Sequence, residues 1–257
     1  MHNPRDELLV SLRALNLGAM AAAVEDTALR AAKEGLTHEA FLLELARIER
    51  AAKASRRIER LLRQSELLPE KNFRSLKLER FDPATRMQIE RLRSGSFLKD
   101  ATNVVAVGRP GAGKSHLACA LGHALVEQGY PVLFTPTGAL VQRLLAAKRD
   151  LRLPQELAKL DRFECLILDD IGYVQHDRDE MEVLFTLLAE RYERKSIVIT
   201  TNLVFSEWER IFKDPMTTLA AIDRVVHHSV VLDLMSVESY RAKAAGAKPT
   251  ASAPVAA

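Results

Sequence analysis

A glycine-rich segment that ends in lysine and serine carries the clearest chemical signal in the sequence. Residues 108–115 read Gly-Arg-Pro-Gly-Ala-Gly-Lys-Ser and fit the pattern GxxxxGK[ST]. In this pattern the glycines let backbone N–H groups surround a β-phosphate, Lys114 reaches the β- and γ-phosphates, and Ser115 offers a hydroxyl to Mg²⁺. The segment lies between the apolar run 103–107 and an amphipathic helix, a context that argues against a chance glycine-rich turn. The residues predicted to bind a nucleoside triphosphate are Gly108, Arg109, Pro110, Gly111, Ala112, Gly113, Lys114, Ser115 and His116.

Two acidic residues directly follow another apolar run and are candidates for the metal and the reacting water. Asp169 and Asp170 come after the Leu-Ile-Leu run 166–168. A strand that ends in an acid is the expected partner of a phosphate-binding loop, so we predict that Asp169 holds Mg²⁺ through its water shell. Asp170 lies just beyond the strand end and is the candidate for polarising the attacking water, with a helix cap or a loop acid as the alternative. Because many ATPases of this kind carry glutamate there, the shorter aspartate implies either a compensating geometry or slow hydrolysis.

Hydroxyl and amide side chains end the next apolar run. Residues 196–199 are followed by Thr200, Thr201 and Asn202. At the carboxyl end of a strand beside the loop, Thr201 or Asn202 can hydrogen-bond a γ-phosphate or orient the attacking water. The alternative is that both residues only terminate the strand, as Thr and Asn often do. Because two acids end a neighbouring strand, we favour the functional interpretation and take Asn202 as a catalytic candidate.

Alternating strand and helix signals supply the elements that must position these groups. Short apolar runs at 103–107, 132–134, 165–168 and 197–200 alternate with helical patterns, and a fifth strand is predicted at 230–232. Continuous apolar strands between helices predict a parallel sheet with helices on both faces. The expected fold class is therefore an α/β P-loop NTPase, preceded by a small all-α domain.

Composition shifts along the chain predict where these parts begin and end. The first part is rich in Ala, Leu, Glu and Arg at helical spacing, and Thr37 supplies half a capping box for its long final helix. A segment without periodicity follows, and a helix is expected after Asp82-Pro83. The predicted divisions are a helical domain over 1–68, a connector over 69–82, an ATPase domain over 83–243 and a disordered tail over 244–257.

The overall composition excludes several classes of protein. With 47% hydrophobic and 28% charged residues, most of the chain is expected to fold as a globular protein. No apolar run approaches the roughly 18 residues of a membrane span, and the N-terminus lacks the apolar centre of a signal peptide, so we expect a cytoplasmic protein without membrane contact. The two cysteines show no metal-ligand spacing, and we expect both in the core.

Positive charge is concentrated in one stretch of the helical domain. Between residues 47 and 63 there are seven basic residues against two acidic ones, a local excess larger than the net charge of +3 of the whole chain. Spacings of three and four place most of them on one helical stripe, which can follow a phosphate backbone or can simply be a solvated face. Without interleaved aromatic residues, backbone contact with duplex DNA is favoured over base stacking. The candidate DNA-binding residues are Arg47, Arg50, Lys53, Arg56, Arg57, Arg60 and Arg63.

Taken together, the loop and the strands LILDD and VITTN resemble those of an AAA+ ATPase, and their order and spacing resemble the helicase-loader branch. The sequence is most similar to the IstB family, the helper ATPases of insertion-sequence transposition. The resemblance extends over about residues 8–241. The further stretches that carry it are ARIERAAKASRRIERLLR, DDIGYV, RYER, TTNLVFSEWERIF, AAIDRVVHHS and SYR.

This resemblance implies a helper ATPase that uses ATP and Mg²⁺, binds double-stranded DNA without sequence preference and recruits or stimulates a cognate transposase. It also implies a homo-oligomer with ATP at the subunit interfaces. Compared with many AAA+ proteins, we expect an ATPase domain without a C-terminal helical lid domain. Within Asp223-Arg224, Arg224 then resembles the arginine that reaches the γ-phosphate of a neighbouring subunit, with a surface salt bridge to Asp223 as the alternative. Arg241 also matches a family position. Two other functions stay open: a replicative helicase loader of the same branch, and a P-loop kinase, which would need an acceptor pocket and a mobile lid.

Overall fold

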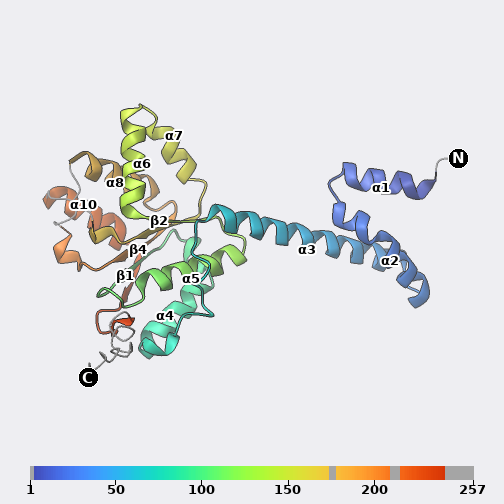
Figure 1. Ribbon diagram of the computed structural model, residues 1–257, viewed down its shortest axis with the longest axis horizontal. Coiled ribbons are helices and arrows are strands. Elements are labelled where there is room, and N and C mark those ends of the chain that lie inside the picture. Colours follow the sequence, from blue (N-terminus) through green and yellow to red (C-terminus); the bar gives the residue numbers. More distant parts are fainter. Residues whose placement is uncertain (1–2, 174–177, 209–214, 241–257) are drawn as a thin grey trace, which may run out of the picture. The chain divides into compact units, whose positions relative to one another are not determined.

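The protein divides into two compact units, with the boundary between Arg60 and Leu61. The computed structural model describes residues 3–173, 178–208 and 215–240, so Arg241 and the tail predicted from residue 244 lie outside the described residues (Figure 1). The first unit is helical and the second is the α/β unit.

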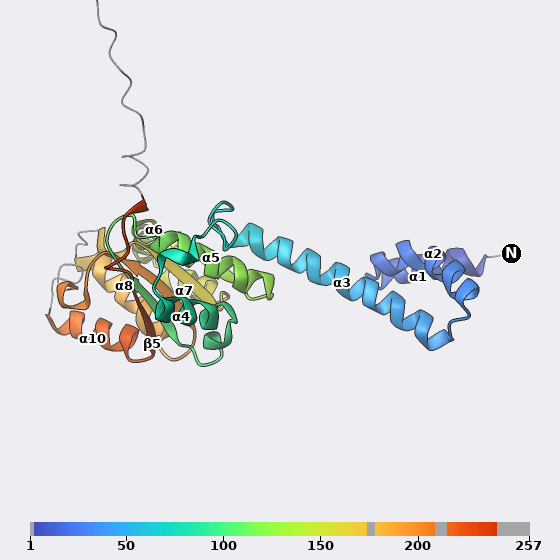
Figure 2. The ribbon, with the colours of Figure 1, turned by 90° about the horizontal axis from the view of Figure 1, so that it is seen from below.

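Three helices form the first unit, as the all-α prediction requires (Figures 1 and 2). They are α1 (Pro4–Ala14), α2 (Gly18–Glu34) and α3 (His38–Gln64), the last of which continues into the second unit. The start of α3 is as predicted, because the Thr37 hydroxyl accepts a hydrogen bond from the N–H of Ala40 at 3.3 Å. The buried apolar side chains of this unit are few: Leu12, Ala21 and Leu45.

A buried carboxylate holds two of these helices together. Glu49 of α3 is only 3% exposed, and its Oε2 accepts hydrogen bonds from the N–H groups of Ala19 (2.8 Å) and Met20 (3.0 Å). These groups belong to the first turn of α2, where no side chain caps the helix from its own N-terminus. The bond from Met20 is the main reason that the pKa of Glu49 lies below its ordinary value, and ion pairs with Lys53 and Arg56 add to it.

We expect the Glu49→Gln variant to melt at a lower temperature than the unaltered protein at neutral pH and at the same temperature in acid. Because the folded-state pKa of Glu49 is depressed, its contribution to stability is present above the unfolded-state pKa of about 4.3 and is lost as the pH falls through the folded-state value. Melting followed by far-ultraviolet circular dichroism measures the difference. The exposed Glu59→Gln on the same helix is the control, and an equal deficit in both variants would contradict the capping role.

The α/β unit contains the remaining elements in the predicted alternation. A helix begins after Asp82, whose carboxylate caps it from the predicted position. The helices are α4 (Pro83–Arg93), α5 (Lys114–Glu127), α6 (Thr137–Arg149), α7 (Leu153–Leu160), α8 (Arg178–Arg191) and α10 (Pro215–Val226). The strands are β1 (Asn103–Val107), β2 (Val132–Pro136), β3 (Cys165–Asp169), β4 (Ser196–Thr201) and β5 (Ser229–Asp233).

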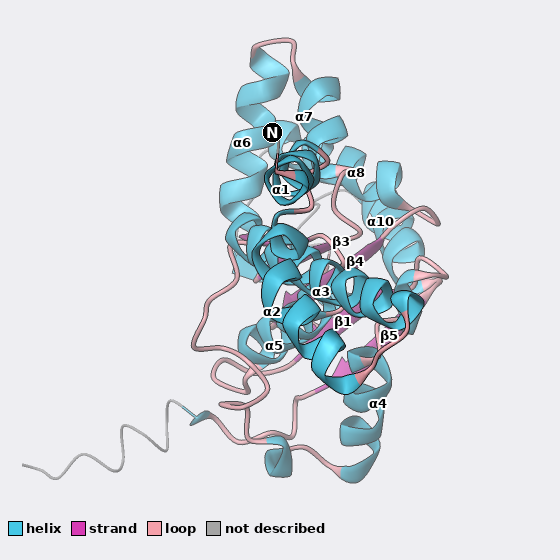
Figure 3. Ribbon diagram, turned by 90° about the vertical axis from the view of Figure 1, so that its right-hand side faces the viewer, coloured by secondary structure: helices cyan, strands magenta, loops and turns pink. Residues whose placement is uncertain are grey.

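The five strands form one sheet in the order β2-β3-β4-β1-β5, and all neighbouring pairs are parallel (Figure 3). This confirms the predicted parallel sheet. Helix α5 packs against one face, whereas α6, α8 and α10 enclose the main apolar cluster on the other (Figure 1). Because strand side chains alternate, Val105 and Leu166 point into that cluster while Ile167 lies against α5. Both cysteines are buried in this unit as predicted, and burial raises the pKa of Cys119 to about 11 and that of Cys165 to about 12.

The segment between α3 and α4 packs on the α/β unit along much of its length. The carbonyl of Ser65 accepts a hydrogen bond from the N–H of Phe134 in the edge strand β2 at 2.7 Å. Leu67 is buried against Gly122 of α5, where an added Cβ would lie 2.6 Å from the leucine side chain, and Phe81 is buried as well. These contacts explain why the division between the units falls after Arg60 rather than after Leu68.

Candidate functional site

A cavity of about 480 Å³ opens at the carboxyl edge of the sheet. The glycine-rich loop forms one side, and the connector forms another. Polar residues at the ends of β3 and β4 complete it together with Tyr240. The lining residues are Lys71, Ser75, Leu76, Lys77, Arg80, Phe81, Pro110, Gly111, Ala112, Gly113, Lys114, Ser115, His116, Asp170, Thr200, Asn202 and Tyr240.

The glycine-rich loop joins β1 to α5, as predicted, and its glycines meet two different requirements. Gly111 and Gly113 have φ values of +83° and +98°, a backbone region that residues with side chains rarely adopt. An added Cβ on Gly113 would meet no atom within 4 Å, so the loop borders open space there. Gly108 is needed for packing instead, because an added Cβ would lie 2.9 Å from the Cβ of Leu234. Helix α5 begins directly after Gly113, and its N-terminal end borders the cavity.

Lys114 lies across the loop. Its side chain is largely buried, and Nζ donates hydrogen bonds to the carbonyl oxygens of Gly108 at 2.7 Å and Arg109 at 3.2 Å. The ammonium group therefore sits inside the curve of the loop, at the position from which a lysine can neutralise phosphate oxygens.

The two acids after β3 have different surroundings. The carboxylate of Asp169 accepts a hydrogen bond from the Thr200 hydroxyl at 2.6 Å, and Asp169 is not among the cavity-lining residues. Asp170 lines the cavity and has the left-handed backbone angle φ +63°, which costs a non-glycine residue on the order of 1 kcal/mol. Its N–H donates to the same Thr200 hydroxyl at 2.8 Å, so β4 fixes the position of both acids.

Asn202 lies at the same cavity, as the sequence predicted for a residue at the end of β4. Its side-chain oxygen is buried and has no hydrogen-bond partner within the part of the chain that the structure describes. This oxygen lies against the backbone of the segment after β3, since a Cβ added to Gly172 would be 2.5 Å from it.

These groups fit a triphosphate with Mg²⁺. The cavity offers an ammonium group and the amino end of a helix for anionic oxygens, while a serine hydroxyl and nearby carboxylates are the oxygen ligands that Mg²⁺ prefers. Strands β1, which precedes the loop, and β3, which precedes the acids, lie on either side of β4 (Figure 3), and both are parallel to it, so the loop and the acids meet at one edge.

The cavity residues that the sequence interpretation missed include three basic residues and a tyrosine. Lys71, Lys77 and Arg80 come from the connector, and Tyr240 follows β5. The N–H of Tyr240 donates to the carbonyl of Gly111 at 2.9 Å, and the cations of Lys77 and Arg80 lie 5.8 and 5.2 Å from the centre of its ring. The connector over 69–82 has four basic residues against three acidic ones, so its charge gave no signal for this placement.

His116 lines the cavity but also contacts the connector. Its Nε2 lies 3.0 Å from the Ser75 hydroxyl and 3.3 Å from the Asn72 carbonyl. Burial is the main cause of the lowered pKa of His116. The residue next to the loop serine therefore joins α5 to the connector.

The structure does not bring Arg224 to this cavity. The residue lies near the end of α10, where Nη1 donates to the Ala220 carbonyl and the guanidinium stacks 4.9 Å from the centre of the Phe185 ring. The side chain of Asn103, at the start of β1, donates to the Arg224 carbonyl at 3.4 Å, so this backbone is at the sheet edge opposite the loop. Among the described residues no ion pair joins Arg224 to Asp223.

All seven basic candidates of α3 are exposed. Two of them, Lys53 and Arg56, form ion pairs with Glu49 at 3.9 and 3.0 Å. The charge of this helix is therefore accessible to solvent. Separately, no helix in the described part of the chain is long and apolar enough to cross a membrane.

The fold and the site define the class of this protein as an AAA+ P-loop ATPase. The parallel sheet, the loop between β1 and α5 and the acids at the end of β3 are its defining features. The chain belongs to the family of IstB-like ATP binding proteins, whose model matches residues 10–247.

Comparisons with individual proteins agree with this assignment. The chain is 45% identical to the insertion sequence ATP-binding protein y4iQ/y4nD/y4sD of Sinorhizobium fredii over 248 residues, 95% of this chain and 83% of that protein. The fold is similar to that of DnaI (TM-score 0.55, 15% identity, 66% of this chain and 95% of the other). It is equally similar to AMPPCP-bound DnaA from Aquifex aeolicus (TM-score 0.55, 14% identity, 66% and 51%).

Proposed function

We propose that this protein is the ATP-dependent DNA-binding helper of an insertion-sequence transposition system. It assembles on duplex DNA as a homo-oligomer with ATP at the subunit interfaces, and it recruits or stimulates the cognate transposase. One observation carries the proposal: a single chain of an insertion-sequence family joins a triphosphate cavity to a helix with seven exposed basic residues.

Different residues of the site bind the phosphates of ATP and the Mg²⁺ ion. Backbone N–H groups of the glycine-rich loop and the ammonium of Lys114 hold the phosphates, and His116 borders the same loop. Ser115 and Asp169 hold Mg²⁺, the latter through the water shell; the ion neutralises phosphate charge when it is bound. The connector cations Lys71 and Lys77 add positive charge on the opposite side of the cavity.

Asp170 and Asn202 activate and orient the water molecule that attacks the γ-phosphate. The left-handed backbone of Asp170 and its bond to Thr200 hold this carboxylate at the cavity, where it accepts a proton from the attacking water. Asn202, which lines the same cavity, orients this water through a hydrogen bond with its side-chain amide. This arrangement compensates for the shorter side chain of aspartate.

The exposed arginines of α3 bind the phosphate backbone of duplex DNA. Contacts of this kind release counterions, so affinity falls steeply as salt rises and depends little on sequence. Lys53 and Arg56 form ion pairs with Glu49, whose carboxylate offsets part of their charge, so we expect Arg47, Arg50 and Arg60 to contribute more to binding.

We expect the ATP-bound protein to bind duplexes of arbitrary sequence and to form larger particles on them. Replacing Arg47, Arg50 and Arg60 by glutamine should reduce the slope of log affinity against log salt by about 0.9 for each contact, hence by about 2.7. Fluorescence anisotropy over a salt series measures the slope, and mass photometry measures the particles. The matched control replaces Arg149, Arg152 and Lys159, exposed residues of the α/β unit, by glutamine and should keep the slope.

An unchanged slope in the α3 variant would contradict DNA binding by this helix. A protein that remains monomeric with ATP and DNA would contradict the assembly. The transposase part is tested separately, by strand transfer with the transposase encoded beside this gene. Loading of a replicative helicase without any effect on that transposase would favour the helicase-loader function instead.

A further inference from the structure

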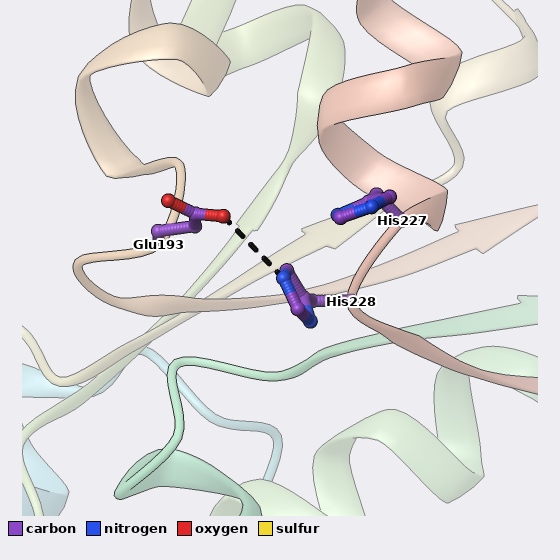
Figure 4. A group of neighbouring side chains, drawn as sticks. All are labelled: Glu193, His227 and His228. Atoms are coloured by element: carbon purple, nitrogen blue, oxygen red, sulfur yellow. Dashed lines mark ion pairs between the residues drawn. The ribbon is translucent and has the colours of Figure 1, made fainter.

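A second group of potential ligands lies at the sheet edge opposite the ATP cavity. Glu193 follows α8, whereas His227 and His228 connect α10 to β5 (Figure 4). One ligand atom from each residue lies within 4.8 Å of the others, and Glu193 Oε1 is 3.4 Å from His228 Nε2. No other group of three such residues this close was found among the residues that the structure describes.

We propose that Glu193, His227 and His228 bind a divalent transition-metal ion of the zinc class. Two imidazoles and one carboxylate are a donor set that suits zinc rather than Mg²⁺ or Ca²⁺, which prefer oxygen ligands alone. Three protein ligands leave one position for a water molecule in a tetrahedral site.

To bind a metal ion, the three ligand atoms need to move only slightly closer together. Ligand atoms of a tetrahedral zinc site lie about 3.3 Å apart, because each is about 2.0 Å from the metal. One pair already meets this separation, and the remaining distances, none above 4.8 Å, shorten when exposed side chains rotate. The two imidazole rings are close and perpendicular, with centres 4.5 Å apart and an angle of 83° between their planes.

The backbone around the ligands is well held. The N–H of His227 donates to the Asp223 carbonyl at 3.0 Å, and the His228 carbonyl accepts from the N–H of Asn103 at 2.7 Å. Glu193 has the left-handed angle φ +54°. A backbone held in this way limits the positions that the three side chains can take before an ion arrives.

A bound ion would join the turn after α8 to the end of α10. Arg224 lies on that last turn of α10, four residues before His228. The ion would therefore restrict the helix end that carries this arginine. This consequence depends on the role proposed for Arg224, whereas the metal site itself does not.

The test uses the full chain without an affinity tag, in the absence of nucleotide, and Zn²⁺ and Co²⁺ as probes. Competition with a chromophoric chelator gives the Zn²⁺ affinity and stoichiometry, and the visible absorption of Co²⁺ reports tetrahedral coordination by nitrogen. We expect one ion per chain. Glu193→Gln, His227→Gln and His228→Gln should each weaken Zn²⁺ binding by about tenfold or more, since even outer-shell partners have effects of that size.

Two controls separate this site from others. His38→Gln removes an exposed histidine of the helical unit, and Asp170→Asn alters the ATP cavity; both should retain the bound ion and the Co²⁺ spectrum. An unchanged affinity in His227→Gln/His228→Gln and in Glu193→Gln would overturn the proposal, as would binding lost equally in His38→Gln. Because the Glu193 and His228 side chains are half exposed, all variants should keep the far-ultraviolet circular dichroism of the unaltered protein.

Discussion

Replacing Arg224 by alanine is expected to lower the rate of ATP hydrolysis by about 10³-fold while ATP binding is retained, the effect expected of an arginine that stabilises phosphoryl transfer. In its own chain Arg224 lies on the last turn of α10, at the sheet edge opposite the glycine-rich loop, and is not a cavity residue. We therefore propose, as the family resemblance implies, that Arg224 acts on the γ-phosphate held by a neighbouring subunit. Steady-state phosphate release and binding of a fluorescent ATP analogue measure the two quantities.

A mixing experiment tests the contribution between subunits. Arg224→Ala subunits retain Asp170, and Asp170→Asn subunits retain Arg224, so an interface between the two kinds can contain one complete site. Hydrolysis by the mixture should exceed that of either variant alone. Failure to recover any activity, although both variants assemble on DNA, would contradict the proposal.

Arg224 also has local contacts, and these must be separated from catalysis. Its stacking on Phe185 contributes about 0.5–1 kcal/mol to stability, too little to unfold the domain. Thermal melting of Arg224→Ala should therefore be close to that of the unaltered protein. Arg149→Ala, a change at an exposed arginine at the end of α6, should affect neither hydrolysis nor melting.

Replacing Arg191 by methionine is expected to reduce the free energy of unfolding by about 3–5 kcal/mol, which is the range for leaving buried polar partners uncompensated. Arg191 is 2% exposed and lies at the end of α8. Burial lowers the pKa of its guanidinium, which nevertheless donates to four backbone carbonyls. The acceptors are Leu160 (3.3 Å), Phe163 (3.1 Å), Glu164 (3.3 Å) and Ser196 (3.1 Å).

Arg194→Met is the matched control for this prediction. Arg194 is exposed and forms ion pairs with Asp161 and Glu190, which contribute about 0–1 kcal/mol. Urea unfolding of both variants measures the difference. Equal destabilisation by the two changes would show that Arg191 does not hold the segment before β3 against α8.

The candidate site was predictable where its signals are local. The pattern at 108–115 specifies a turn, a helix start and a lysine within eight residues, and the polar groups after β3 and β4 directly follow apolar runs. Parallel strands place such ends at one edge, which is why Asp170 and Asn202 meet at the predicted cavity. The connector residues were not predictable in the same way, because nothing local indicates that Lys71 or Arg80 faces the loop.

By itself the sequence determined the phosphate-binding loop, the five strands, their parallel arrangement and the helical first unit, because periodicity, capping and turn chemistry act over a few residues. Only the tertiary structure decided which distant groups meet. In it, Glu49 is buried against the start of α2, and Arg224 lies at the sheet edge opposite the ATP cavity of the same chain. It also brought Glu193 to His228. Contacts like these depend on how whole helices and strands pack. They join residues that are far apart along the chain, so no local sequence pattern indicates them.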